Sequence, residues 1–182
     1  MILSDATIAE YIKEKKIVIL PEFDQSNIRP AGIRLHLGEE ILVLRPNQTV
    51  VVDGTDTVQY DHIKISPQGY ALPPGGFILG STYESFQLPR NVIGYFDGRS
   101  TVARLGLAIH CTSATVDGNF EEPRSVVLEI KNQSPMTLVL RPKMAIAMLV
   151  LHELTTPIQQ NAQAQYKGQT SVVPPNLKVQ KQ

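Results

Sequence analysis

Short runs of β-branched and other apolar residues, separated by Pro and Gly, recur along this chain from residue 17 onward. The runs that we predict as strands are residues 41–44, 50–52, 77–82, 92–96, 107–112, 126–131, 137–140 and 145–151. Many short strands with turn residues between them are typical of an antiparallel sandwich or barrel. The hydrophobic pattern therefore predicts a mainly β fold.

The start of the chain has a different period. Ser4 precedes Ile8, Tyr11 and Ile12, which share one face at the three-and-four spacing of a helix. Serine is also a preferred residue at a helix N-cap. We therefore expect a short amphipathic helix before the first strand.

A chain of 182 residues is long enough for one compact domain, and we expect residues 1–182 to form a single domain. After Pro157 the apolar pattern gives way to Gln, Asn and Pro. Such a composition is typical of a mobile terminus. On this pattern alone, residues 158–182 are a C-terminal tail outside the main sheet.

The charges are balanced, with 17 Lys and Arg against 17 Asp and Glu. No overall field attracts nucleic acid or a membrane surface, although a small charged ligand can still bind locally. The first residues lack the basic and apolar segments of a leader, and no apolar run approaches the length of a membrane span. We expect a soluble, cytoplasmic protein that binds neither nucleic acid nor membrane.

A single cysteine, Cys111, restricts the metal chemistry. The zinc-dependent nucleobase deaminases need His-x-Glu and a downstream Pro-Cys-x-x-Cys to hold the metal that activates water. One cysteine cannot supply this set, so we expect no zinc site. The sequence also has no Walker-type phosphate loop and no Gly-x-Ser-x-Gly nucleophile elbow, which argues against a kinase, an NTPase motor and a serine esterase.

The densest polar signal follows the strand predicted at 92–96. Arg99 and Arg104 lie on either side of the hydroxyl residues Ser100 and Thr101. The planar fork of arginine matches phosphate oxygens, so this segment is a candidate phosphate-binding site. An ordinary charged turn that leads into a short helix remains the alternative.

A second candidate lies in the strand predicted at 126–131. Its alternation turns Leu128 and Ile130 to one face, and Val127, Glu129 and Lys131 to the other. If Glu129 faces a pocket, desolvation would favour its protonated form and suit it to general acid and base catalysis. Otherwise it is a solvent-facing acid paired with Lys131.

Taken in order, these segments resemble the dCTP deaminase family, which belongs with the trimeric dUTPases. The matching stretches are the opening residues 1–12, residues 28–33, 74–77 with Thr82, Glu84, Leu88 and Pro89, 99–107 (RSTVARLGL), His110 with Thr112, Asp117, 127–129 with Asn132, 140–142 and 166–169 (YKGQ). The resemblance implies a dUTPase-like β-barrel or jelly roll of short antiparallel strands, with a short N-terminal helix, that forms a homotrimer.

The resemblance also implies roles for individual residues. Glu129 would be the catalytic acid and base, while Ser100 and Arg104 would orient the attacking water and stabilise developing charge. Asp117 would meet the deoxyribose, and Gln169, on the tail, would close the pocket, often against a neighbouring subunit's site. The full substrate-binding set is Arg99, Ser100, Thr101, Val102, Ala103, Arg104, Ser113, Asp117, Val127, Leu128, Glu129, Tyr166 and Gln169.

Several positions depart from the family pattern. Arg34 replaces a common Asp, and Ser113 replaces a small alanine beside the attacking water. The loop 118–124 is substituted and two residues longer. Ile158 and Gln165 stand where a phosphate-facing Tyr and Lys are common. Contacts to the triphosphate are therefore expected to be weaker or to involve other residues.

The resemblance implies metal-independent hydrolytic deamination of dCTP to dUTP and ammonia, for pyrimidine deoxynucleotide synthesis. Mg²⁺ would be bound through the nucleotide phosphates, since no cluster of carboxylates is evident for it. One alternative is hydrolysis of dUTP to dUMP and diphosphate, alone or as a second activity of the same site. Another is a non-catalytic relative that binds a nucleotide or a protein partner.

Overall fold

The computed structural model describes residues 1–54, 56–117, 122–159, 166 and 169–177. A nine-stranded sheet with the path β10-β8-β13-β3-β6-β11-β9 dominates this part of the chain, and β2 and β4 pair with β3. All of its pairings are antiparallel. Its strands are β2 (Ile28–Arg29), β3 (Gly32–Leu44), β4 (Tyr60–Lys64), β6 (Phe77–Thr82), β8 (Val92–Gly98), β9 (Leu107–Ala108), β10 (Thr115–Val116), β11 (Val127–Asn132) and β13 (Ala145–Glu153).

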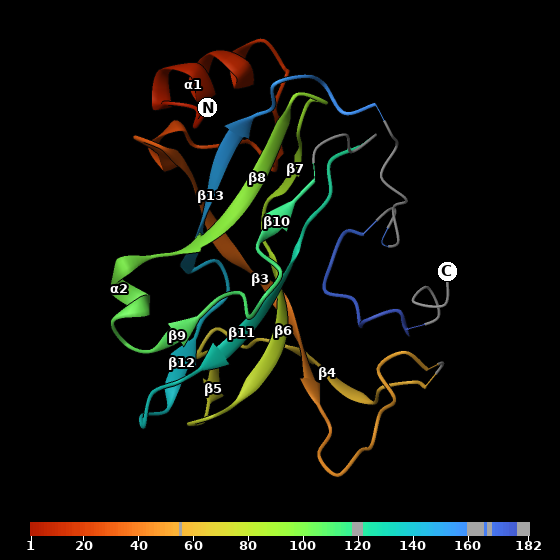
Figure 1. The fold of residues 1–182 in the computed structure, drawn as a ribbon. Coiled ribbons are helices and arrows are strands. Elements are labelled where there is room, and N and C mark those ends of the chain that lie inside the picture. The colour runs from red at the N-terminus through yellow and green to blue at the C-terminus, as the bar shows by residue number, and fades with distance from the viewer. Residues whose placement is uncertain (55, 118–121, 160–165, 167–168, 178–182) are drawn as a thin grey trace.

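Smaller elements complete the fold (Figure 1). Two short antiparallel pairs lie beside the main sheet, β1 (Val18–Leu20) with β7 (Ser85–Gln87) and β5 (Tyr70–Leu72) with β12 (Leu138–Leu140). The helices are α1 (Asp5–Lys13), a 3-10 turn (Gln25–Asn27) and the one-turn α2 (Ser100–Ala103). Within the described ranges, no helix has the length and apolar character needed to cross a membrane.

The long strand β3 joins the two halves of the sheet. Its first half pairs with β13, and its second half pairs with β6 and β4. The register shifts between Leu37 and Ile41, and such irregularities bend a strand. Gly38 lies at this bend, where a Cβ atom would come within 2.7 Å of the Ser81 Oγ. The absence of a side chain at residue 38 therefore lets β3 and β6 approach closely as the sheet curls.

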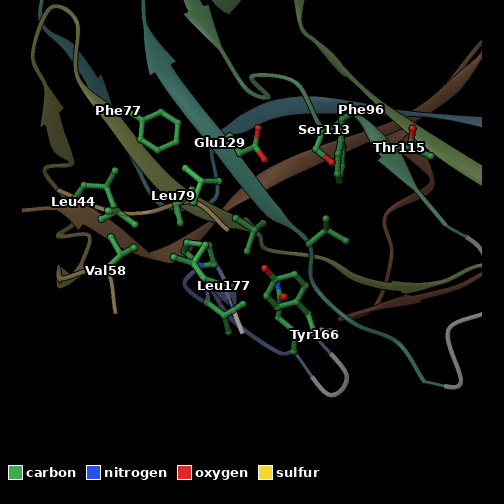
Figure 2. A pocket seen from close by; sticks show the side chains of 17 residues that line it. Leu44, Val58, Phe77, Leu79, Phe96, Ser113, Thr115, Glu129, Tyr166 and Leu177 are labelled. Atoms are coloured by element: carbon green, nitrogen blue, oxygen red, sulfur yellow. The ribbon is translucent and has the colours of Figure 1, made fainter. Parts of the chain in front are cut away.

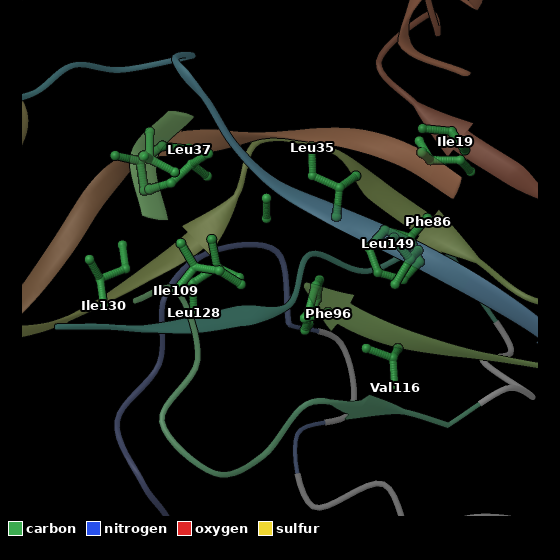
Figure 3. Close-up of a cluster of buried hydrophobic side chains, with 14 of the residues drawn as sticks. Ile19, Leu35, Leu37, Phe86, Phe96, Ile109, Val116, Leu128, Ile130 and Leu149 are labelled. Atoms are coloured by element: carbon green, nitrogen blue, oxygen red, sulfur yellow. The ribbon is translucent and has the colours of Figure 1, made fainter. Parts of the chain in front are cut away.

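The curled sheet encloses one large apolar core (Figure 3). Each strand contributes alternate residues, such as Leu35 and Leu37 from β3, Phe96 from β8 and Leu128 from β11, and all four are at most 5% exposed. Full burial of such a side chain contributes roughly 1.5–3 kcal/mol. The core is therefore strong enough to hold the strands in a fixed register.

The mainly β prediction and the N-terminal helix are confirmed. Ser4 caps α1, its Oγ accepting a hydrogen bond from the N–H of Thr7 at 3.5 Å, and Ile8 is fully buried. The strand predicted at 77–82 has the observed bounds of β6, and the one at 126–131 is β11 shifted by one residue. The prediction at 41–44 captured only the end of β3.

Two strand predictions were wrong. Residues 50–52 are a turn, in which the N–H of Gly54 donates to the Val51 carbonyl and the N–H of Val51 donates to Asp56. The strand predicted at 107–112 ends at Ala108. Beyond it, the N–H groups of Cys111 and Thr112 donate to a side-chain carboxylate rather than to a neighbouring strand.

Candidate active site

A pocket of about 590 Å³ opens between the outer face of the sheet and the C-terminal segment 169–177 (Figure 2). Its walls combine residues from β11, β6 and the end of β3 with residues after β9 and from the C-terminal segment. The lining residues are Leu44, Val50, Val52, Val58, Phe77, Leu79, Phe96, Ser113, Thr115, Val126, Val127, Glu129, Tyr166, Gln169, Val173, Pro175 and Leu177. Most of these side chains are apolar, so the walls offer an apolar surface to a ligand.

Strand register explains why an acid stands in this apolar wall. Glu129 on β11 pairs with Leu79 on β6, which pairs in turn with Leu42 on β3. Directly paired residues of antiparallel strands project to the same face. Val172 of the C-terminal segment packs on Leu42 and Leu79 and covers this face. Glu129 is therefore half-buried in a layer of apolar side chains (Figure 2).

Backbone amides hold the Glu129 carboxylate. Its Oε2 accepts hydrogen bonds from the N–H groups of Cys111 at 3.0 Å and Thr112 at 3.5 Å. Among the described residues, Oε1 has no hydrogen-bond partner. Lys131, the alternative partner suggested by the sequence, donates instead to the Gly75 carbonyl at 2.5 Å. One carboxylate oxygen is thus anchored while the other is left for a ligand or water.

The loop that anchors Glu129 also carries Ser113 into the pocket lining. Partial burial and then the nearby Glu129 charge raise the pKa of the Cys111 thiol. Its Sγ donates to the Glu129 carbonyl at 3.6 Å. Cys111 therefore contacts the acid through both its backbone N–H and its side chain.

The C-terminal segment is fastened to the sheet by polar contacts. Gln169 is buried, and its Nε2 donates to the Ser125 carbonyl at 3.2 Å. The Ser171 hydroxyl donates to Glu40 Oε2 at 2.7 Å, and this bond is the main reason why the pKa of Glu40 lies below its ordinary value. Tyr166 lines the pocket, and its hydroxyl accepts from the N–H of Asn176 at 3.2 Å.

Five of the expected substrate-binding residues meet at the pocket. These are Ser113, Val127, Glu129, Tyr166 and Gln169. Asp117 is exposed at the end of β10 and does not line the pocket, and Leu128 turns its side chain into the core, where it is 1% exposed. Two departures from the family pattern, at residues 118–121 of the loop and at Gln165, lie outside the described residues.

The remaining expected residues lie on α2 or directly beside it, outside their own chain's pocket. Figure 1 shows α2 and the segment 169–177 on opposite sides of β11. None of Arg99, Ser100, Thr101, Val102, Ala103 and Arg104 lines the pocket. Val102 packs into the core at 7% exposure, whereas Ser100, Thr101 and Arg104 are exposed. Within one chain, α2 and Glu129 therefore do not form one site.

Some pocket residues were missed in the sequence. Phe77 and Leu79 face the pocket because they alternate along β6, and the sequence gives that alternation without saying which strand pairs with β11. The Cys111 and Thr112 amides carry no side-chain signal, so the sequence could not identify them as donors to Glu129. Within the described ranges, no group of three or more His, Cys, Asp and Glu residues could hold a metal.

The fold and the site define a class: a curled antiparallel β protein whose own C-terminal segment closes a ligand pocket that contains one anchored carboxylate. The model of the dCTP deaminase-like family matches residues 2–154. The chain therefore belongs to the dCTP deaminase-like family, as its sequence motifs predicted.

Named relatives agree with this assignment. The chain is 33% identical over 192 residues to the dCTP deaminase of Buchnera aphidicola, covering 97% of this chain and 98% of that one. It is 35% identical over 163 residues to a Methanobrevibacter smithii protein named "dCTP deaminase, dUMP-forming", covering 87% of this chain and 83% of that one.

A solved structure shows the same fold. The 2'-deoxycytidine 5'-triphosphate deaminase of Agrobacterium tumefaciens superposes with a TM-score of 0.66 at 20% identity. The superposition covers 84% of this chain and 48% of that one, so this chain spans about half the length of that protein. This likeness confirms the predicted mainly β architecture and shows that a deaminase of the family has the same fold.

Proposed function

We propose that this protein deaminates dCTP hydrolytically to dUTP and ammonia, with no metal acting on the base. The observation that carries the proposal is the Glu129 carboxylate, which is anchored by two backbone amides in an apolar pocket. Family membership supplies the substrate, since relatives over nearly the full length are named dCTP deaminase. The apolar walls provide the surface on which a pyrimidine ring can pack.

Glu129 would act as both base and acid. It takes a proton from water as the hydroxide adds to C4 of cytosine, and it delivers that proton to ring nitrogen N3. Glu129 then carries the remaining hydroxyl proton to the amino nitrogen on C4. The tetrahedral intermediate releases this amino group as ammonia and becomes uracil. Ser100 and Arg104 would orient the water and stabilise the charge that develops during attack.

We further infer that the working unit is a homotrimer with sites between subunits. Ser100, Thr101 and Arg104 are exposed on α2 and do not reach their own chain's pocket. A neighbouring copy could bring these residues to Glu129, because symmetric oligomers repeat the same interface around an axis. Mg²⁺ would enter with the nucleotide phosphates, as the sequence suggested.

A second candidate activity is the further hydrolysis of dUTP to dUMP. It is favoured by the relative from Methanobrevibacter smithii, whose name includes dUMP formation. The two activities share a nucleotide and a binding pose, so one site can support both.

One product analysis tests these proposals. The purified protein is incubated separately with dCTP, dUTP and dCMP in the presence of Mg²⁺, and the products are separated by anion exchange while ammonia is measured. Ammonia and dUTP from dCTP are expected for the deaminase. The appearance of dUMP and diphosphate would identify the bifunctional enzyme. Nucleotide-dependent thermal stabilisation without any product would refute catalysis and identify a binding protein.

A further inference from the structure

Three arginines from separate parts of the chain come together around β3 and β13 of the sheet. Arg29 ends β2, Arg34 lies on β3, and Arg99 directly follows β8. Arg29 pairs with Gly32, two residues before Arg34, so both side chains project to the same face. That face is opposite the core, because Ile33 and Leu35 on either side of Arg34 are buried.

Arg99 reaches the same face across β13. Its Nη1 donates to the Ala145 carbonyl at 2.6 Å, and Ala145 pairs with His36 on β3. The pKa of Arg99 lies below its ordinary value, first because of burial and then because Arg34 and Arg29 place positive charge nearby. The three arginines therefore lie near one another on this face, and they are called here the arginine cluster.

The arginine cluster has no negative partner in the part of the chain that the structure describes. The ion pairs there involve other cations, including Arg45 with Asp61 and Lys143 with Glu39. Arg34 Nε is buried and has no hydrogen-bond partner among these residues. Asp97 on β8 and Arg34 on β3 both pair with Met148 on β13, the strand between them. The Asp97 Oδ1 accepts a hydrogen bond from the N–H of Gly98 at 2.7 Å and not from Arg34.

Such an arrangement is costly unless something negative binds to it. Like charges repel, and a buried donor without a partner loses the hydrogen bond that it made to water. A guanidinium pairs best with carboxylate or phosphate oxygens, which can accept two parallel hydrogen bonds. A polyphosphate chain carries several negative charges and can neutralise all three arginines, whereas one carboxylate cannot.

We propose that the arginine cluster binds the polyphosphate chain of the nucleotide, with Arg34 and Arg29 as phosphate-binding residues in addition to Arg99. The inference rests on the proposed function and names two residues outside the set expected from the family pattern. Arg34 replaces an Asp of that pattern and so reverses the charge at its position. The same chain has Ile158 and Gln165 where a phosphate-facing Tyr and Lys are common. Arg34 and Arg29 would compensate for these two losses.

The cluster is contiguous with the candidate phosphate segment. Arg99 immediately precedes Ser100 and α2. In the proposed trimer, the cluster would therefore serve the same site as α2, with the base held in a neighbouring subunit's Glu129 pocket.

The test uses inorganic tripolyphosphate, which contains the phosphate chain without the base. Isothermal titration calorimetry compares the full-length protein with Arg34→Gln, and Arg45→Gln serves as the matched control. Arg45 is an exposed arginine paired with Asp61, so its substitution changes the net charge equally without touching the cluster. We expect Arg34→Gln to weaken tripolyphosphate binding at least tenfold and Arg45→Gln to change it less than twofold. Equal affinity of the two variants would overturn the proposal.

Two further measurements complete the design. If Arg34→Gln does not fold, as judged by circular dichroism, Arg29→Gln replaces it, because Arg29 is exposed and its substitution leaves the core intact. Unchanged tripolyphosphate affinity of Arg29→Gln would then refute the proposal. Sedimentation distinguishes a subunit contact from a phosphate site: dissociation of Arg34→Gln with unchanged tripolyphosphate affinity would mean that Arg34 pairs with a neighbouring subunit and would also refute the proposal.

Failure of this proposal can be separated from failure of the proposed function. Tripolyphosphate binding requires no turnover. A protein that binds tripolyphosphate through Arg34 but releases no ammonia from dCTP would retain the phosphate site and lose the deaminase assignment. A protein that releases ammonia from dCTP, but whose tripolyphosphate affinity is unchanged by Arg34→Gln, would retain the deaminase assignment and lose the phosphate site.

Discussion

The Glu129 carboxylate accepts a hydrogen bond of 3.0 Å from the backbone N–H of Cys111. This bond joins β11 to the loop after β9, which also carries Ser113 into the pocket lining. The acid proposed to move protons thus also positions one wall of its own site. Loss of its charge and loss of its hydrogen-bonding oxygen are therefore expected to have different effects.

Glu129→Ala should destabilise the fold more than Glu129→Gln. The glutamine carbonyl oxygen can still accept from the Cys111 and Thr112 amides, whereas alanine leaves both donors without this acceptor. Both amides belong to exposed residues, so water can take the place of the lost acceptor, and the difference is no more than one ordinary hydrogen bond. We expect urea unfolding to show a loss of up to about 1 kcal/mol for Glu129→Ala relative to Glu129→Gln. Equal free energies of unfolding would show that the carboxylate does not hold the loop.

The sequence predicted the elements whose signal is local. Ser4 and the spaced apolar residues after it predicted α1, and the apolar run at 77–82 predicted β6. It did not predict the length of β3, because residues 32–40 mix buried Leu with Arg, His and Glu. It also misassigned 50–52, where β-branched residues occupy an exposed turn that is set by the Val51 N–H bond to Asp56.

The candidate site was also predicted only where its signal is local to one strand. Alternation along β11 was enough to turn Glu129 away from Leu128 and the core. The distance between Glu129 and α2 depends on how β8, β11 and the C-terminal segment are placed in three dimensions. Sequence order says nothing about such placement. The arginine cluster was missed because Arg29, Arg34 and Arg99 become neighbours only through strand pairing.

Mixed trimers test whether Glu129 and Arg104 come from different subunits. Glu129→Gln and Arg104→Ala are each expected to be nearly inactive as pure proteins. After co-refolding in equal amounts, about a quarter of the sites would combine an intact Glu129 with an intact Arg104 from the neighbour. We therefore expect about a quarter of wild-type ammonia release. No recovery in verified mixed trimers would place both residues in one subunit's site.

Sedimentation of the wild-type protein provides the accompanying measurement. We expect a trimer at micromolar concentration, because the proposed site joins exposed α2 residues of one subunit to the Glu129 pocket of another. A fully active monomer would contradict the shared site.

The docking of the C-terminal segment should depend on pH through Glu40. Its lowered pKa reflects the bond from Ser171, so the ionised form is favoured when the segment is docked. For a lowered pKa, the stabilisation is present above the ordinary value of 4.5 and is lost as the pH falls through the lowered value. Hydrogen exchange of residues 169–177, corrected for intrinsic rates, should therefore show more protection at pH 7 than in this acidic range.

Ser171→Ala should weaken protection of the segment at pH 7 and reduce its acid dependence. Ser26→Ala is the matched control, since Ser26 makes an equivalent hydroxyl bond to Asp24 far from the segment. Equal protection of residues 169–177 in both variants would show that the Ser171–Glu40 bond does not hold the segment in place.

Zinc removal should leave the rate unchanged when Mg²⁺ is supplied in excess. The proposed chemistry assigns the activation of water to Glu129, Ser100 and Arg104, and the single cysteine cannot build the zinc site of the nucleobase deaminases. Ammonia release is compared before and after treatment with a zinc-selective chelator. Activity that is lost on chelation and restored only by zinc would contradict the metal-independent mechanism.

The most direct test of the account is the ammonia released from dCTP by Glu129→Gln. The substitution keeps the size and hydrogen-bonding reach of the side chain but removes its ability to cycle a proton. We predict that the turnover number falls at least ~10²-fold while the dissociation constant for dCTP changes only a few fold. Arg104→Ala, the comparison variant, should weaken binding and rate together, because the proposed mechanism has its charge contact the ligand in both the ground and transition states. Turnover of dCTP by Glu129→Gln at near the wild-type rate would show that Glu129 is not the catalytic acid and base, and the proposed mechanism would be wrong.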